Sequence, residues 1–217
     1  MKTVIRPNAL VPLVVLCGTL LASPAHAGRP LVVDDADVAE AGTGHVEAWY
    51  GRLTARTNTW NVAPVYVVVD GLELGAALVR DTTTPTTGSA LQAKWRITPV
   101  QEHGCNLGAS VGASHASNGG GNATFVNAIG TCNSDFGALH LNLGGNRASH
   151  GPTLGTWGVA VERAFDQITA NLEAFGQRRS KPGFQAGLRT DIAPGLQIDG
   201  SIGRQERDTL FSVGFKK

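Results

Sequence analysis

The feature that most constrains this chain is an alternation of apolar and polar residues that recurs along most of its length. From Leu91 to Ile97 every odd position is apolar, while Gln92, Lys94 and Arg96 occupy the even positions. Such a period of two is typical of a β-strand whose two faces meet different environments. Similar alternation occurs at Leu139 to Leu143, Ile168 to Ala174, Phe184 to Leu188, Leu196 to Asp199 and Phe211 to Phe215.

Turn-forming stretches separate these segments, for example Asp70-Gly71, Asp81 to Gly88 and Arg178 to Gly183. Each is rich in Gly, Pro, Asn, Asp or Ser, which favour tight turns. Counting the segments between turns from Thr43 gives about twelve strands, and their length of about ten residues suits a tilted membrane span. The sequence therefore predicts an all-β fold, an antiparallel transmembrane β-barrel of about twelve strands over residues 43–217.

Two other architectures compete with the barrel. A soluble β-sandwich also alternates, but its strands are usually five or six residues long. Disorder is the other alternative for a chain with 28 glycines, yet only 16% of the residues are charged. Disordered chains are rich in charge and poor in alternating β-branched and aromatic residues. Strand length therefore favours the barrel over the sandwich, and the alternation argues against disorder.

The first residues have the order of a secretory signal. Lys2 and Arg6 precede an apolar run from Ala9 to Ala22, which ends before Ala25-His26-Ala27. We expect residues 1–27 to be a cleaved signal peptide and residues 28–42 to be a periplasmic segment ahead of the barrel. The expected location is the bacterial outer membrane, with membrane lipid as a partner and the barrel-assembly machinery as a partner during insertion.

The composition predicts no further cofactor or macromolecular ligand. Removal of residues 1–27 takes away two basic residues and no acid, so the formal charge changes from +1 to −1. A nucleic-acid partner is not expected from a chain with so little basic excess. No Cys and His set with metal-ligand spacing is present, so neither a metal nor another cofactor is predicted.

Cys105 and Cys132 are predicted to pair in one hairpin. If the turn is centred between Asn118 and Gly119, the two cysteines lie directly opposite each other, and apolar neighbours also face apolar neighbours. An oxidising periplasm permits a disulfide at such a pair. The alternative is two reduced cysteines on adjacent strands.

The polar face of the predicted strands carries charges of both signs. In a barrel these side chains would line the lumen, where they could select solutes by charge and size. The alternative is a static network that fills a small barrel. The expected lumen-lining residues are Glu47, Glu73, Lys94, Arg96, His140, Glu162, Glu173, Arg189 and Asp199.

The start of the mature chain resembles an outer-membrane family named after the MetA pathway of phenol degradation. The resemblance rests on Arg29 to Asp35, followed by Gly42 to Glu47, and it extends to the closing pair of strands at Leu196 to Phe215. It implies a barrel for passive passage of small, often apolar or aromatic, molecules and brings no catalytic residues. Phe215 is followed by Lys216-Lys217, whereas such barrels usually end on an aromatic residue.

An enzymatic alternative comes from His115-Ala116-Ser117-Asn118. This spacing resembles the His-x-Ser-Asn motif of outer-membrane phospholipase A and of the lipid A deacylases, in which the histidine would activate the serine. Asn122 is predicted to lie opposite His115 in the hairpin. The position that should supply the third polar residue is Ile129, so a passive channel is preferred over a lipid hydrolase or a structural barrel.

Overall fold

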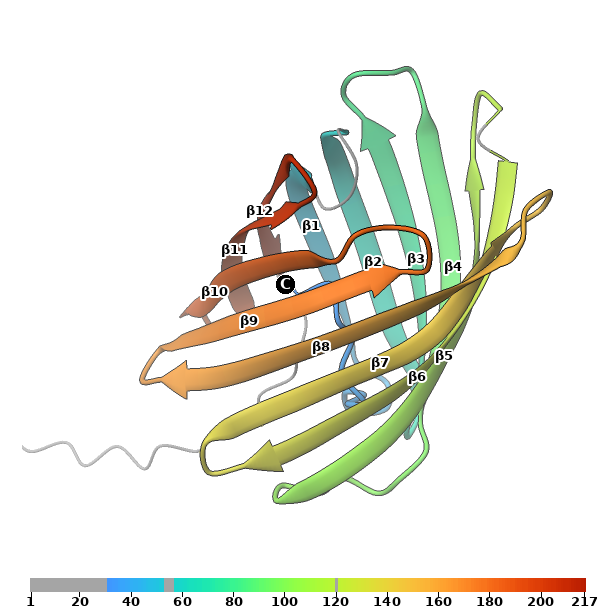
Figure 1. Cartoon of the computed structure of the whole chain (residues 1–217). Coiled ribbons are helices and arrows are strands. Elements are labelled where there is room, and N and C mark those ends of the chain that lie inside the picture. The colour runs from blue at the N-terminus through green and yellow to red at the C-terminus, as the bar shows by residue number, and fades with distance from the viewer. Residues whose placement is uncertain (1–30, 53–56, 120) are drawn as a thin grey trace, which may run out of the picture.

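The computed structural model describes residues 31–52, 57–119 and 121–217. The predicted signal peptide, residues 1–27, lies outside the described residues. The rest forms twelve antiparallel strands that close into one barrel, with β1 hydrogen-bonded to both β2 and β12 (Figure 1). The prediction of a twelve-stranded antiparallel barrel is confirmed.

The strands are 9 to 14 residues long and follow one another around the barrel in sequence order. Their bounds are β1 Gly44–Arg52, β2 Thr59–Val69, β3 Leu72–Asp81, β4 Thr87–Arg96, β5 Gly104–Ala116, β6 Gly121–Ser134, β7 Gly137–Ala148, β8 Thr153–Phe165, β9 Ile168–Gln177, β10 Gly183–Ala193, β11 Leu196–Gln205 and β12 Asp208–Lys216. Closure leaves no strand with an unpaired edge, which removes the main aggregation hazard of a sheet.

The start of β1 and the end of β12 lie at the same end of the barrel, which we call the terminal rim; the opposite end is the far rim. Glu47 pairs with Lys216 across the closing seam. The longest connection at the terminal rim, residues 97–103, joins β4 to β5. Within the described ranges there is no helix long and apolar enough to span a bilayer.

The outside of the barrel is apolar. Leu78, Leu91 and Leu143 expose 60%, 69% and 70% of their surface, and their neighbours along each strand point inward. A soluble monomer rarely exposes large apolar side chains in such a continuous belt, whereas a lipid-facing barrel surface requires it. The alternation read from the sequence therefore separates a lipid-facing exterior from a polar interior.

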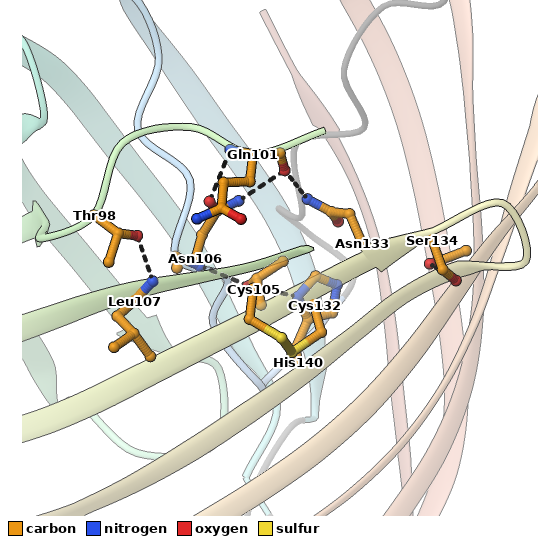
Figure 2. The surroundings of a disulfide bond; sticks show 12 residues. Thr98, Gln101, Cys105, Asn106, Leu107, Cys132, Asn133, Ser134 and His140 are labelled. Atoms are coloured by element: carbon orange, nitrogen blue, oxygen red, sulfur yellow. Dashed lines mark hydrogen bonds between the residues drawn. A yellow bond between two sulfur atoms is a disulfide. The ribbon is translucent and has the colours of Figure 1, made fainter. Parts of the chain in front are cut away.

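The hairpin of β5 and β6 has the predicted register. Asn118 and Gly119 both have positive φ, 57° and 85°, as a two-residue hairpin turn requires. Cys105 lies opposite Cys132, and the two form a disulfide at the terminal rim (Figure 2). The prediction of this disulfide is confirmed.

The connection from β4 to β5 is held against the same hairpin. The backbone N–H of Gln101 donates to Asn106 Oδ1 (2.9 Å), and Asn133 Nδ2 donates to the Gln101 carbonyl (3.2 Å), as Figure 2 shows. Thr98 Oγ1 accepts a hydrogen bond from the backbone N–H of Leu107 (2.9 Å). These contacts fix residues 97–103 at the terminal rim beside the disulfide.

Candidate functional site

The interior of the barrel carries the nine charged and histidine residues that the sequence analysis assigned to the lumen. Seven of them are buried, and the side chains of Glu47 and Arg96 expose only 15% and 11% of their surface. A buried charge is costly unless a partner or a hydrogen-bond donor compensates it. The partners of these charged side chains therefore decide whether they form a static network or line a passage.

The N-terminal segment, residues 31–43, lies inside the barrel (Figure 1). Val33, Asp35 and Ala36 are buried almost completely, at 2%, 1% and 0% exposed. The periplasmic location expected for residues 28–42 stays a prediction, and the described part of that range, residues 31–42, lies against the inner face of the barrel. The physical reason is that inward-facing side chains of the strands satisfy the backbone of the segment.

Polar side chains on β4, β6 and β7 and the backbone of β2 hold this segment. Ala36 N donates to Thr131 Oγ1 on β6 (2.9 Å), and the Asn142 side chain on β7 both accepts from Asp34 N (2.8 Å) and donates to the Asp34 carbonyl (2.8 Å). On β4, Arg96 donates to the Val38 carbonyl (3.2 Å). At the terminal rim the backbone of Gly42 and Thr43 pairs with Val67 on β2. The segment is thus tied to the wall along its length.

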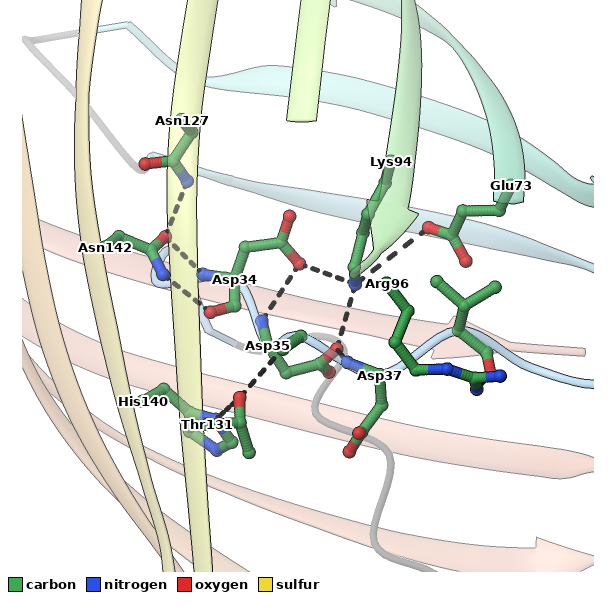
Figure 3. Close-up of polar contacts among 12 residues, drawn as sticks. Asp34, Asp35, Asp37, Glu73, Lys94, Arg96, Asn127, Thr131, His140 and Asn142 are labelled. Atoms are coloured by element: carbon green, nitrogen blue, oxygen red, sulfur yellow. Dashed lines mark hydrogen bonds and ion pairs between the residues drawn. The ribbon is translucent and has the colours of Figure 1, made fainter. Parts of the chain in front are cut away.

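Lys94 on β4 is the central cation of the interior. Its Nζ donates to Asp34 Oδ1 (3.0 Å) and Asp35 Oδ1 (2.9 Å), and it lies 4.0 Å from Glu73 Oε1 on β3 (Figure 3). The lysine is 5% exposed. One buried ammonium therefore serves three carboxylates, two of which belong to the N-terminal segment.

On the opposite wall, ion pairs and hydrogen bonds compensate Glu162 and Glu173 more completely than the three carboxylates around Lys94. Glu173 on β9 accepts hydrogen bonds from the backbone N–H groups of Val32 and Val33 at 2.8 to 3.0 Å and from Gln185 Nε2 at 2.6 Å. Glu162 on β8 forms a bidentate ion pair with Arg189 on β10, at 2.9 and 2.6 Å. Such paired and hydrogen-bonded charges form a static network.

Asp34 and Asp37 of the N-terminal segment have perturbed acidities. Burial raises the pKa of Asp34, and its charged neighbour Asp35 adds to the rise, although Lys94 opposes it. Burial also raises the pKa of Asp37 to about 6, again with a contribution from Asp35. Both carboxyl groups therefore hold a proton at higher pH than they would in water.

A cavity of about 990 Å³ passes along the N-terminal segment. Its wall includes Ser180, which follows β9 at the far rim, and His45 and Lys216 at the terminal rim. Glu162 and Arg189 do not line it, whereas Lys94, Glu73 and Glu47 do. The interior therefore combines a sealed polar network on one side with a cavity whose lining reaches both rims.

No metal-binding group of three or more His, Cys, Asp or Glu residues occurs among the residues that the structure describes. Asp34, Asp35, Glu162 and Glu173 contact cations or backbone N–H groups rather than converging on one point. His140 is 1% exposed and its Nδ1 lies 3.0 Å from Thr131 Oγ1, which itself holds the N-terminal segment. This histidine supports the segment through Thr131.

The residues of the hydrolase alternative lie on the outside of the β5–β6 hairpin near the far rim. His115 Nδ1 is 2.7 Å from Asn122 Oδ1, so these two residues are adjacent as predicted. Ser117 Oγ instead accepts a hydrogen bond from the backbone N–H of Thr87 (2.9 Å). His115 and Ser117 are not hydrogen-bonded to each other in the described structure, so the geometry gives the serine no general base.

Sequence reasoning missed the part that the N-terminal segment plays in the interior. Asp34 and Asp35 belong to the motif that carries the family resemblance, but the alternation of the strands assigns them no place in the lumen. One signal was available: Lys94 and Arg96 occupy inward-facing positions of one strand and need acidic partners. An acidic pair flanked by Val33 and Ala36 could have been assigned to them.

Solved structures with similar folds are outer-membrane barrels. The KdgM porin in complex with disordered oligogalacturonate has a TM-score of 0.70 and 11% identity, covering 79% of this chain and 97% of that chain. The COG4313 outer membrane channel from Pseudomonas putida F1 has a TM-score of 0.67 and 11% identity, covering 84% and 97%. The outer membrane protein Omp33 from Acinetobacter baumannii has a TM-score of 0.53 and 10% identity, covering 80% and 95%. At these identities the likeness shows the fold alone.

Comparison at the level of sequence gives the family. No curated protein matches this chain. The resemblance to the family named after the MetA pathway stays a prediction, because the family whose model matches carries another description. That model spans residues 15–210, most of the chain, and so the protein belongs to the family described as "Uncharacterised conserved protein UCP029691".

Proposed function

We propose that this protein is an outer-membrane channel that lets small molecules move passively down their gradient. The observation that carries the proposal is the cavity of about 990 Å³, because residues of both rims line it. The apolar exterior suits lipid, and closure of the barrel pairs each described strand with two neighbours, as a membrane-spanning sheet requires. Solved barrels of similar fold are described as a porin and as an outer membrane channel.

The proposed solutes are small molecules with an apolar or aromatic part. Trp49, Phe125 and Phe175 line the cavity together with Leu31 and Val33 of the N-terminal segment. Aromatic and aliphatic surface favours contact with apolar portions of a solute, while amides and carboxylates favour its polar portions. The resemblance to the MetA-pathway family supports the same class of solute.

Export and insertion belong to this proposal. Residues 1–27 have the order of a secretory signal, and the barrel-assembly machinery would insert the folded chain into the outer membrane. The aromatic residue that such machinery reads would be Phe215 on β12. The N-terminal segment would enter the barrel from the periplasmic side, at the terminal rim.

Purified protein in planar lipid bilayers tests the channel. We expect discrete conductance steps, together with swelling of proteoliposomes in neutral solutes up to a size limit. The matched control is the same protein denatured and added under identical conditions. Correctly folded protein that gives neither conductance nor solute flux would contradict the proposed function.

A further inference from the structure

The charges that line the cavity are unbalanced. Its carboxylates outnumber its ammonium groups: the acids are Asp34, Asp35, Asp37, Glu47 and Glu73, and the lysines are Lys94 and Lys216. Counting these carboxylates and lysines as ionised leaves an excess of three negative charges, and His45, 3.7 Å from Glu47 Oε1, can add one positive charge when protonated. A narrow aqueous path between low-dielectric walls concentrates ions of the opposite charge.

The two lysines do not neutralise this excess locally. Lys94 is shared among Asp34, Asp35 and Glu73, and Lys216 lies 3.9 Å from Glu47 Oε1. Arg96 is directed to Val38 and to Asp70, whose side chain is 83% exposed at the terminal rim. The cavity is therefore lined by fewer lysines than carboxylates, and several carboxylates depend on the same lysine.

Asp35 supplies a second, independent observation. Its side chain lines the cavity, yet the residue is only 1% exposed. Oδ1 is bonded to Lys94 and to the backbone N–H of Asp37, whereas Oδ2 has no hydrogen-bond partner among the described residues. A buried carboxylate oxygen without a donor is costly, and its negative charge beside the cavity attracts cations there through the electrostatic field.

The contrast with the sealed side of the interior supports the same conclusion. There Glu162 has its own arginine, and Glu173 has two backbone N–H groups and an amide. Glu162 and Glu173, which do not line this cavity, thus have more complete ion-pair and hydrogen-bond partners than the acids that share Lys94.

We infer that the passage selects cationic solutes over anionic ones, with Asp35, Asp37 and Glu73 as the residues that set this preference. The inference rests on the proposed channel function and names the charge class of its solutes. Aromatic side chains beside the carboxylates extend the preference to organic cations, because ring faces attract cationic groups.

The test is the reversal potential of bilayers that hold the wild-type protein in a KCl gradient. The permeability ratio of K⁺ to Cl⁻ is expected to exceed one, and Asp37→Asn and Glu73→Gln are each expected to lower it by roughly half. Asp166→Asn is the matched control. It removes one carboxylate from an exposed turn away from the cavity, at a positive φ of 56° that asparagine tolerates.

Flux into proteoliposomes provides a second measurement with solutes of similar size and opposite charge. Benzylammonium is expected to enter faster than benzoate in wild type, and the difference is expected to shrink in Asp37→Asn but not in Asp166→Asn. Conductance with a K⁺ to Cl⁻ ratio at or below one would overturn the selectivity while leaving the channel function intact. Absence of conductance from folded protein would overturn both.

Discussion

Lys94 is the residue on which the contacts between the barrel wall and the N-terminal segment converge. Its ammonium group holds Asp34 and Asp35, both within 3.0 Å, and lies near Glu73. The sequence predicted an inward position for Lys94 from alternation alone, because a period of two fixes the face of each strand residue. The alternation alone does not identify Asp34 and Asp35 as the partners of Lys94, because they lie about 60 positions earlier in the chain, outside any alternating segment.

Replacement of Lys94 by Met removes the shared cation and leaves three carboxylates facing one another. Breaking a buried ion pair on one side typically costs about 3 to 5 kcal/mol, so we expect a loss of that order in the free energy of unfolding. Urea titration of the protein in lipid vesicles measures it. Lys181→Met, at an exposed position near the far rim, is the control; equal stability of both variants would contradict the role assigned to Lys94.

Asp37 makes the proposed selectivity depend on pH. Burial, with the charge of Asp35, raises its pKa to about 6, while Lys94 and Arg96 act in the opposite direction. Because the pKa is raised, the negative charge is present above pH 6 and is lost as the pH falls through that value. We expect the K⁺ to Cl⁻ permeability ratio to fall between pH 8 and pH 5.

The same reversal-potential measurement on Asp37→Asn checks the assignment. The variant lacks the group that titrates near pH 6, so its ratio is expected to vary less over this range. Burial also raises the pKa of Asp34, so this carboxyl group can contribute to a pH dependence that remains in the variant. An identical pH profile in the two proteins would exclude Asp37 as the titrating group.

Among the structural elements, the N-terminal segment and the β5–β6 hairpin show the two extremes of what sequence can predict. Local residues specify the hairpin: Asn118-Gly119 sets the turn, and the alternation sets the register that joins Cys105 to Cys132. The N-terminal segment has no period and no turn signal. Its conformation is fixed by side chains from several distant strands, so its path is specified only by the closed barrel.

Glycines in the wall make room for this segment. A Cβ added to Gly158 on β8 would lie 2.7 Å from Val33 Cγ2, closer than packed atoms approach. In Gly158→Leu we expect residues 31–34 to move away from β8, with loss of the hydrogen bonds to Glu173 and a larger single-channel conductance. Bilayer recordings measure this change.

Gly155→Leu on the same strand is the matched control for that variant. Its added Cβ would meet only the Gly144 carbonyl oxygen within 4 Å, at 3.9 Å, so the wall and the segment should be undisturbed. Equal conductance in wild type and in folded Gly158→Leu would show that the segment does not limit the passage.

The disulfide is expected to stabilise the hairpin of β5 and β6. It closes a loop with a sequence separation of 27 residues, for which the chain-entropy relation gives roughly 3 to 4 kcal/mol. The double variant Cys105→Ser, Cys132→Ser should therefore unfold at lower urea concentration than wild type. Reduction of the wild-type protein with dithiothreitol should give the same shift, and a shift in neither case would contradict a stabilising role.

At the scale of the whole molecule, the correct predictions of strands, of their two faces and of a closed barrel all follow from the alternation. Twelve strands with one apolar and one polar face can bury the polar face only by closing on themselves, and β1 pairs with β12 accordingly. The course of the cavity could not be predicted in the same way. It depends on how much of the interior the N-terminal segment and the Glu162–Arg189 pair occupy together.

The interior position of Leu31 also bears on how this protein can be handled. Since Leu31 lines the cavity, any chain joined ahead of it begins inside the barrel, whereas Lys217 is exposed at the rim. An affinity tag or reporter fused ahead of Leu31 would have to lie within the passage or thread out of it. A tag joined after Lys217 would extend into solvent, so this position is the more suitable attachment point for purification and labelling.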